Sequence, residues 1–235
     1  MVSHNEKKLR KKNRVSHKPP KRRKNKSLPT IIGIGVVFAI IVAFFITQIE
    51  PPISTEGLPP FTLTQPHEFD NTQGDGPIFF IKYSDFQCPA CASFSPLLKQ
   101  MMDDYGEHIT FAYRHFPLKQ QFANSVQAAR ASEAAARQDA FWEYHDTLFA
   151  QQREWANVGN PTPFFVRYAT ELGLDEAQFR ADLADPEIAA IVEHSYQHAI
   201  SQGMSGTPSL YLNGRPLQGI SSYEDLALRI ERELR

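Results

Sequence analysis

Cysteine is scarce in this chain, which has only two cysteines in 235 residues. A small fold held together by several disulfides is therefore excluded. Glycine is also sparse, with 12 residues, so a collagen-like chain is excluded, and no internal repeat stands out. The 42% of hydrophobic and 11% of aromatic residues exclude a wholly disordered chain and are sufficient for one domain with a substantial core.

The net charge of −1 conceals two parts of opposite sign. Residues 1–30 hold 12 of the 25 Lys and Arg residues and one acid, Glu6, whereas the remainder carries 13 basic and 25 acidic residues. An acidic body is repelled by phosphates, so we expect no nucleic-acid-binding domain. The basic tail could bind nucleic acid, but the anionic inner leaflet of a membrane is the simpler partner.

Residues 27–49 form a run of 23 without a charged side chain, rich in Ile, Val and Phe. As a helix this run would be about 34 Å long, enough to cross the core of a bilayer. A cleaved signal peptide and a buried core helix are the alternatives. The long basic stretch before the run, and the lack of small residues at 47–51, favour an uncleaved signal anchor. The basic cluster at 21–26 predicts that residues 1–26 are a cytoplasmic tail and that the body lies outside the cytoplasm, on a single-pass anchor in the cell membrane.

Residues 50–76 are predicted to be a proline-rich spacer, because prolines are frequent there and Gly74-Asp75-Gly76-Pro77 has the composition of a turn. The folded body then spans residues 77–235. It opens with a buried-strand pattern at 78–83, a helix from about Cys88 and a second strand at 109–113, which together predict a βαβ unit.

The remainder of the body is predicted to be mainly helical. Helical patterns cover residues 124–138, 139–149, 163–172, 175–183 and 186–202. A hairpin follows at 209–217 around Asn213-Gly214, and the last helix begins at Ser222, with Ser221 and Glu224 spaced as a capping box.

Both cysteines lie in Cys88-Pro89-Ala90-Cys91, directly after a predicted strand and at the start of a helix. A helix N-terminus presents free N–H groups and a positive dipole, which stabilise a thiolate on Cys88 and make it the attacking and leaving sulfur. The two-residue spacer lets Cys91, one turn along, reach back and close a disulfide. The pattern therefore predicts a redox-active pair.

Three other interpretations compete with a redox pair. A structural disulfide would close a loop of four residues and so would stabilise the fold little. A metal site would need His194 and His198, about a hundred residues away, which a polar helix face explains equally well. The third alternative is that Cys88 and Cys91 are two unrelated buried thiols at the same junction between strand and helix. We expect no metal and no cofactor.

From Pro77 to Arg235 the chain resembles the DsbA-like branch of the thioredoxin superfamily. The matching motifs are Tyr83-Ser-Asp-Phe-Gln-Cys-Pro-Ala-Cys91, Pro96, Arg114-His-Phe-Pro-Leu118, Phe141-Trp-Glu-Tyr-His145 and Gly206-Thr-Pro-Ser209. The resemblance implies an α/β thioredoxin fold with a helical insertion at about residues 120–202. It also implies a cis bond before Pro208, which would turn the backbone of Thr207 toward Cys88 to pair with an extended substrate.

The same resemblance implies a dithiol oxidase that forms disulfides in reduced, unfolded exported proteins. It further implies a membrane partner of the DsbB or vitamin-K-epoxide-reductase type, which passes electrons to quinone. A reductase or isomerase is one alternative, and a non-catalytic module that binds partner chains is another. The chain lacks an obvious dimerisation domain, which disfavours the isomerase and predicts a monomer.

Two positions depart from the family pattern. Ala90 stands where many strongly oxidising relatives have a histidine, so the disulfide should be less easily reduced than theirs. Lys82 stands where relatives usually have a buried acid. Its ammonium group either extends to solvent, the commoner fate of lysine, or lies near the cysteines and modulates their pKa values. Phe141, Trp142 and His145 are expected to pack in the core of the insertion rather than to contact substrate.

Overall fold

The structure, a computed structural model, describes residues 38, 40–42, 44 and 53–235. The chain divides into two units, Met1–Pro52 and Ile53–Arg235. The five described residues of the first unit are helical, and within the described ranges no helix has the length and apolar character needed to span a membrane. Most of the predicted anchor at 27–49, and all of the predicted tail at 1–26, lie outside the described residues.

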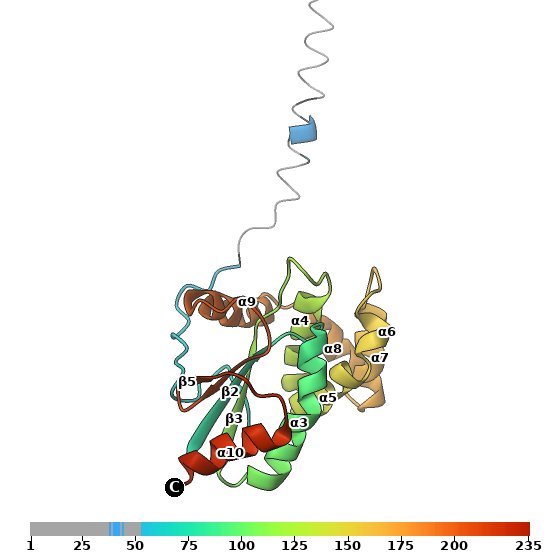
Figure 1. The fold of residues 1–235 in the computed structure, drawn as a ribbon. Helices are drawn as coiled ribbons and strands as arrows, with labels where there is room; N and C mark the ends of the chain where they lie inside the picture. The colour runs from blue at the N-terminus through green and yellow to red at the C-terminus, as the bar shows by residue number, and fades with distance from the viewer. Residues whose placement is uncertain (1–37, 39, 43, 45–52) are drawn as a thin grey trace, which may run out of the picture. The chain divides into compact units, whose positions relative to one another are not determined.

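The second unit is an α/β domain built on a five-stranded sheet (Figure 1). Its strands are β1 (Asn71–Gln73), β2 (Ile78–Ser84), β3 (Ile109–His115), β4 (Ser209–Leu212) and β5 (Arg215–Leu217). Its helices are α3 (Pro89–Tyr105), α4 (Ser125–Ala136), α5 (Phe141–Ala150), α6 (Gln152–Trp155), α7 (Thr162–Glu171), α8 (Glu176–Leu183), α9 (Pro186–Ser201) and α10 (Tyr223–Glu233). The strand order is β1-β3-β2-β4-β5.

Strand β2 lies in the centre of the sheet and is buried along its whole length. It pairs parallel with β3 and antiparallel with β4, and the β2-α3-β3 segment is the predicted βαβ unit. Side chains alternate between faces along a strand. Ile78 and Phe80 therefore pack toward α3 and α10, whereas Phe79, Ile81 and Tyr83 pack on the other face.

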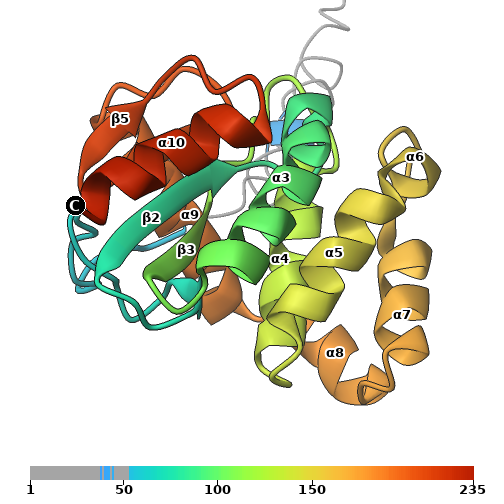
Figure 2. The same ribbon diagram turned by 60° about the horizontal axis from the view of Figure 1, so that its bottom comes forward.

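Helices cover both faces of this sheet (Figures 1 and 2). Phe94, Leu98 and Met101 of α3 and Leu226 and Ile230 of α10 form one apolar layer with the sheet. Helix α9 covers the opposite face, where Ala199 belongs to the second layer. The domain thus has the helix, sheet, helix layering of α/β folds.

The helical insertion is formed by α4 to α8, which gather beside the sheet with a core of their own (Figure 2). Alanine dominates α4, so its backbone can approach α5 and α8 closely. The largest buried side chains of this core include Trp155, Tyr144, Phe165 and Phe179. The same core extends to Cys88 and Cys91, so the insertion packs directly against the cysteine pair.

Residues 53–76, assigned to the spacer by the sequence, contribute to the folded domain. Strand β1 pairs antiparallel with β3, and the Phe61 side chain is only 6% exposed. Arg114 of β3 pairs with Asp70 through two hydrogen bonds of 2.6 and 2.7 Å, and its guanidinium lies 4.7 Å from the Phe61 ring. The packed body therefore begins well before the predicted boundary at Pro77.

Most predicted elements are present, with ends that differ by one or two residues. The turn Asn213-Gly214 joins β4 to β5, and both residues have positive φ, of 48° and 78°. The cap of α10 is one residue later than predicted, since Ser222 accepts a hydrogen bond from the Asp225 amide. The short elements β1 and α6 were not predicted, because three- and four-residue segments carry too little periodicity.

Candidate active site

Cys88 is the N-cap residue of α3, and Cys91 follows one helical turn later. Extended backbone at Cys88 (φ −73°, ψ 121°) ends the connection from β2, and Pro89 occupies the first turn of the helix, where its missing N–H costs nothing. Both cysteines are free thiols. Cys88 is 6% exposed and Cys91 is 0% exposed, so Cys88 is the outer and Cys91 the inner sulfur of the pair.

The surroundings of Cys88 favour a thiolate. A hydrogen bond from the Cys91 thiol, together with the backbone N–H groups of Ala90 and Cys91, lowers the pKa of Cys88 to about 5 despite the opposing effect of burial. These N–H groups belong to the free first turn of α3, where the helix dipole also favours negative charge. The surroundings of Cys88 therefore favour its thiolate form at neutral pH.

The surroundings of Cys91 favour the protonated thiol. Burial raises the pKa of Cys91, and its hydrogen bond to Cys88 raises it further, whereas the positive charge of Lys82 acts in the opposite direction. The two sulfurs lie one turn apart but have shifts of opposite sign. A pair of this kind ionises first at the outer cysteine.

Lys82 lies in the interior, not at the surface. The alternative that its ammonium extends to solvent is wrong, because the side chain is 0% exposed. Residue 82 belongs to a central strand between β3 and β4, so its side chain must enter a packed layer. Burial lowers the pKa of Lys82 to about 8, and the neighbouring Cys91 and Cys88 oppose this shift.

The loop before β4 faces the outer cysteine. The peptide bond between Thr207 and Pro208 is cis, as the resemblance implied, and the Cys88 thiol donates a hydrogen bond of 3.4 Å to the Thr207 carbonyl. Pro89 and Ala90, between the cysteines, are both exposed. The structure thus brings the predicted residues of the active-site loop together around Cys88.

Asp85 is a residue of the site that the sequence analysis missed. Its carboxylate accepts hydrogen bonds of 2.8 and 2.7 Å from the backbone amides of Gln87 and Leu118, and so links the turn before Cys88 to the segment after β3. Burial raises the pKa of Asp85 to about 6. Its place in the Asp-Phe-Gln segment before the cysteines is the only signal in the sequence.

Gln152 is a second such residue, and it comes from the insertion. The Gln152 amide group donates hydrogen bonds of 2.7 Å to the carbonyl of Phe86 and 3.1 Å to that of Cys88. The side-chain carbonyl of Gln87 in turn accepts a hydrogen bond of 2.7 Å from the Asn124 amide. The active-site turn is therefore held in place by residues more than 30 positions away, which no local pattern indicates.

The aromatic motif of the insertion packs as expected. Phe141 and His145 are buried, and Trp142 is partly buried with its indole N–H donating to the Thr72 carbonyl at 3.0 Å. His145 lies in a cluster of rings with Phe86, Tyr113 and Phe149. These three rings belong to the same core as Cys88 and Cys91.

His194 and His198 lie on α9, away from the cysteines, and contact Phe61. His198 Nδ1 is 2.5 Å from the Tyr83 hydroxyl. Burial lowers the pKa of His198 to about 4. Within the described part of the chain, no group of three or more His, Cys, Asp or Glu side chains is arranged to hold a metal ion.

Comparison with known proteins agrees with this fold. The thioredoxin family model matches residues 73–232. Curated relatives include the Na(+)/H(+) antiporters NhaA 3 of Salinispora tropica, 33% identical over 75% of this chain, and NhaA 1 of Salinispora arenicola, 34% identical over 68%. The chain spans only about a quarter of the length of these relatives, 26% and 24% respectively.

The similar solved structures are oxidoreductases of the DsbA type. Oxidised BdbD from Bacillus subtilis is 22% identical with a TM-score of 0.65, over 75% of this chain and 99% of its own. The alpha-DsbA1 protein from Wolbachia pipientis is 21% identical with a TM-score of 0.63, over 71% of this chain and 92% of its own. The match to the family model over most of the chain, with the cysteine pair at the start of α3, shows that the chain belongs to the thioredoxin family.

Proposed function

We propose that this protein is a membrane-anchored thiol:disulfide oxidoreductase that oxidises dithiols of exported proteins through Cys88 and Cys91. The contrast between the two pKa shifts is the observation that carries the proposal. A thiolate that is stable at neutral pH favours the reduced form of the pair, so the disulfide form readily accepts electrons. A pair used only to stabilise the fold has no need of this asymmetry.

The reaction begins with the pair as a disulfide. A substrate thiolate attacks Cys88 Sγ, the bond between Cys88 and Cys91 breaks, and Cys91 leaves with the electron pair and takes up a proton. A second substrate thiolate attacks the substrate sulfur of the mixed disulfide and releases Cys88 as a thiolate. The substrate loses two electrons to form its disulfide, and the enzyme pair gains them.

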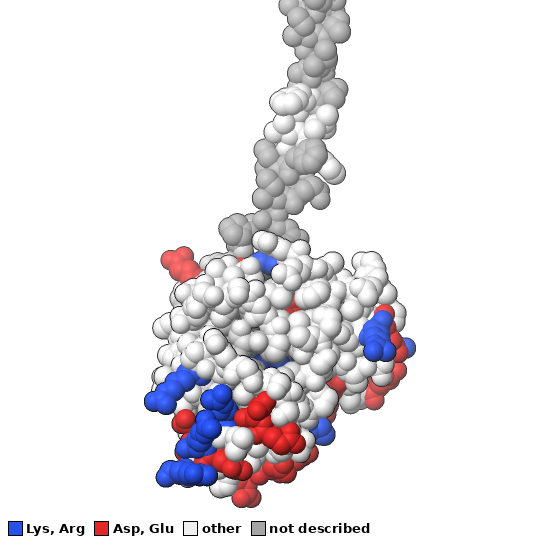
Figure 3. All heavy atoms as spheres, viewed as in Figure 1, with Lys and Arg blue, Asp and Glu red and all other residues white. Residues whose placement is uncertain are grey.

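The surface near Cys88 supports binding of an extended chain. The Thr207 backbone lies beside the Cys88 sulfur, where its peptide groups are positioned to pair with a substrate strand. On the face viewed in Figure 3, charged side chains gather toward α10 and the C-terminal end of α3, and at the edge near α6 and α7. A surface of low charge around the N-terminal end of α3 suits unfolded chains of varied sequence.

The cellular arrangement is part of the same proposal. Residues 1–26 would be a cytoplasmic tail, residues 27–49 a signal anchor and the following segment a tether, so that the domain works outside the cytoplasm as a monomer. The supporting observation is the uncharged run of 23 residues after a strongly basic flank. A membrane thiol oxidase that passes electrons to quinone would return the pair to the disulfide.

Two measurements on the full chain test the proposal. The thiol state of the pair in cells should be mainly disulfide, and the purified protein should introduce disulfides into a reduced, unfolded protein. A mainly dithiol state in cells would instead indicate a reductase or isomerase. A pair that resists mild reductants would indicate a non-catalytic module.

A further inference from the structure

The helical insertion contains a pocket that the redox site does not use. Helices α4, α7 and α8 pack together there (Figure 2), and the pocket that they line has a volume of about 430 Å³. Binding sites for small molecules usually have volumes of about 300–1,000 Å³. Among the described residues that line the pocket there is no cysteine and no residue of the Thr207 loop. The pocket is therefore separate from the redox site.

The charged side chains of the pocket all have the same sign. Arg130 of α4 and Arg180 of α8 line it together with the polar Gln127 and Thr162, and its described lining includes no Asp or Glu. This is unusual in residues 31–235, where 25 acidic residues outnumber 13 basic ones. A hollow lined by charges of one sign attracts a ligand of the opposite sign, which is here an anion.

Arg130 has no partner for its charge within the described part of the chain. Its Nε is buried without a hydrogen bond, and no described acid pairs with its guanidinium. The acid one turn along α4, Glu133, instead contacts His115 at 2.6 Å and Asn71 at 2.7 Å. The C-terminal end of α8 borders the pocket too, but its carbonyl groups accept no hydrogen bond from this arginine. A buried N–H without an acceptor is costly, and a bound anion would remove that cost.

Two further features favour an anion at the same place. The Arg180 Nε donates to Glu176 at 2.8 Å, but the two terminal nitrogens of Arg180 have no partner among the described residues. Helix α7 begins at Thr162, so the positive end of its dipole lies at the pocket. The pocket thus combines two guanidinium groups with a helix N-terminus.

The rest of the lining is mainly apolar. Phe165 of α7 is 1% exposed, and Leu183 of α8 packs against the same core. A guanidinium binds a carboxylate through two parallel hydrogen bonds, whereas an apolar wall favours a hydrocarbon group. The complementary ligand therefore has one carboxylate and a compact apolar body.

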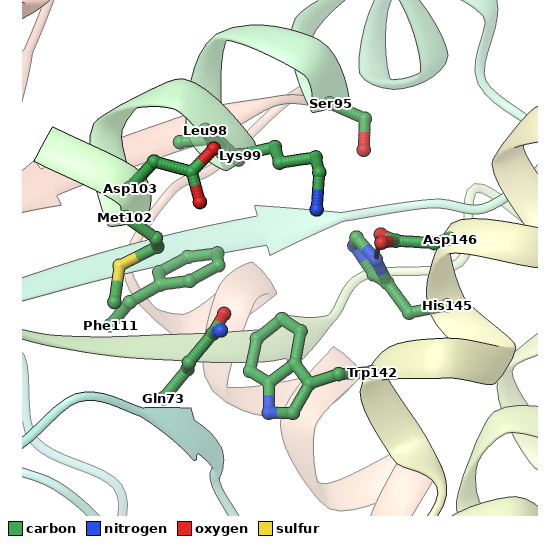
Figure 4. A pocket seen from close by; sticks show the side chains of 10 residues that line it. All are labelled: Gln73, Ser95, Leu98, Lys99, Met102, Asp103, Phe111, Trp142, His145 and Asp146. Carbon is green, nitrogen blue, oxygen red and sulfur yellow. Dashed lines mark hydrogen bonds and ion pairs between the residues drawn. The ribbon is translucent and has the colours of Figure 1, made fainter. Parts of the chain in front are cut away.

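The cavity between α3 and α5 has a different character. Its volume is about 70 Å³, enough for a few water molecules, and its lining includes Lys99, Asp103 and Asp146. Figure 4 shows the Lys99 amine pointing toward Asp146. The basic group of this cavity therefore meets acids of the same lining, and the space is too small for an organic ligand.

We propose that the pocket of α4, α7 and α8 binds a small organic carboxylate. The carboxylate lies on Arg130 and Arg180, and the apolar body lies against Phe165 and Leu183. This inference goes beyond the proposed function and does not depend on the thiol chemistry of the cysteine pair. Its test is a binding measurement, so its failure and the failure of the redox proposal are separate results.

Calorimetric titration of the full-length protein with 4-phenylbutyrate is the principal test, with the solubilising detergent alone as the blank. We expect one site with a dissociation constant of about 2 mM or lower, an ordinary affinity for a ligand of about 12 heavy atoms. The uncharged 4-phenylbutanamide and inorganic phosphate, which lacks an apolar body, should each bind at least about tenfold more weakly. Absence of binding by 4-phenylbutyrate, or equal binding of the amide, overturns the inference.

Replacement of the unpaired arginine tests where the carboxylate lies. Arg130→Met should raise the dissociation constant of 4-phenylbutyrate at least about tenfold, because a charged hydrogen-bonding partner is lost. Arg153→Met, at an exposed position of α6 outside the pocket, is the matched control and should leave the constant unchanged. Without ligand, Arg130→Met should not lower the unfolding temperature, because no described partner is lost. A lowered unfolding temperature with unchanged affinity would show a structural arginine and overturn the inference.

Gln127→Glu keeps the inference testable if Arg130→Met does not fold. Gln127 is exposed and lies one helical turn before Arg130, so a carboxylate there would pair with the arginine and repel the ligand. We expect about tenfold weaker binding of 4-phenylbutyrate, and unchanged binding would overturn the inference. A peptide with a free C-terminal phenylalanine that binds more than about tenfold more tightly than 4-phenylbutyrate would assign the pocket to a protein C-terminus and overturn the choice of a small acid.

Discussion

The outer and inner sides of the cysteine pair differ in almost every physical property. Cys88 meets the free N–H groups of a helix N-terminus and the Thr207 carbonyl, at the edge of the surface. Cys91 is fully buried in the core of the insertion, near Lys82. One helical turn therefore separates a sulfur that ionises readily from a sulfur that resists ionisation.

This difference shows how a fold can give two identical side chains opposite pKa shifts. Donors that are already in place stabilise the charge on Cys88, whereas the loss of solvent destabilises the charge on Cys91. In the proposed reaction the substrate attacks Cys88, the less buried of the two sulfurs, and Cys88 leaves as a stable thiolate in the second exchange. The inner sulfur can only close the pair or be released from it.

The largest expected effect comes from removing either sulfur. Cys88→Ser should abolish thiol exchange, whereas Cys91→Ser should form mixed disulfides with substrates that no internal thiol resolves. Non-reducing gel electrophoresis after acid quenching would detect these adducts. Full activity of Cys91→Ser without adducts would mean that the two roles are reversed or that the pair is not catalytic.

The second effect concerns the ionisation of Cys88 in the reduced protein. Its largest stabilising contribution is the hydrogen bond from Cys91, so Cys91→Ala should raise the pKa of Cys88 from about 5 toward the ordinary value for cysteine. Thiolate absorbance in the ultraviolet, followed against pH, measures this shift. An unchanged titration would show that the helix N-terminus alone sets the pKa.

The third effect is a pH dependence of stability that differs between the redox forms. In the reduced protein the pKa of Cys88 is about 5 when folded and about 9 when unfolded, so the unfolded state binds more protons between these values. The unfolding free energy of the reduced form should therefore rise with pH across this window, relative to that of the disulfide form. Denaturant unfolding of both forms at pH 5 and pH 8 would measure the difference, and equal changes would contradict it.

The smallest effect tests how the helical insertion holds the turn that contains Phe86 and Cys88. Gln152→Leu leaves the carbonyls of Phe86 and Cys88 without their donor and should lower the unfolding free energy by about 1–3 kcal/mol. Gln151→Leu, at an exposed neighbouring position, is the control. A loss of equal size in both variants would indicate a general effect on the α5 and α6 segment.

Local patterns in the sequence were sufficient to predict the framework of the domain. The buried-strand pattern at 78–83 predicted β2, the helical pattern from about Cys88 predicted α3, and Asn213-Gly214 predicted the hairpin. Each of these depends on neighbours in the chain, through side-chain periodicity or the backbone freedom of a turn. The position of the cysteines at the start of a helix followed directly.

Contacts between distant residues were decided by the tertiary structure. No local signal shows that Lys82 is buried against α3 and α5, because a lysine on a strand reaches solvent unless helices cover its face of the sheet, and only the tertiary structure shows that they do. The same holds for Phe61, which packs against Arg114 more than 50 positions away, and for Gln152 beneath the active-site turn. The amino-acid sequence by itself determined that Cys88 stands at the N-terminus of a helix with Cys91 one turn later, whereas only the packing of distant elements buries Cys91 and Lys82, because desolvation exists only once the chain has folded.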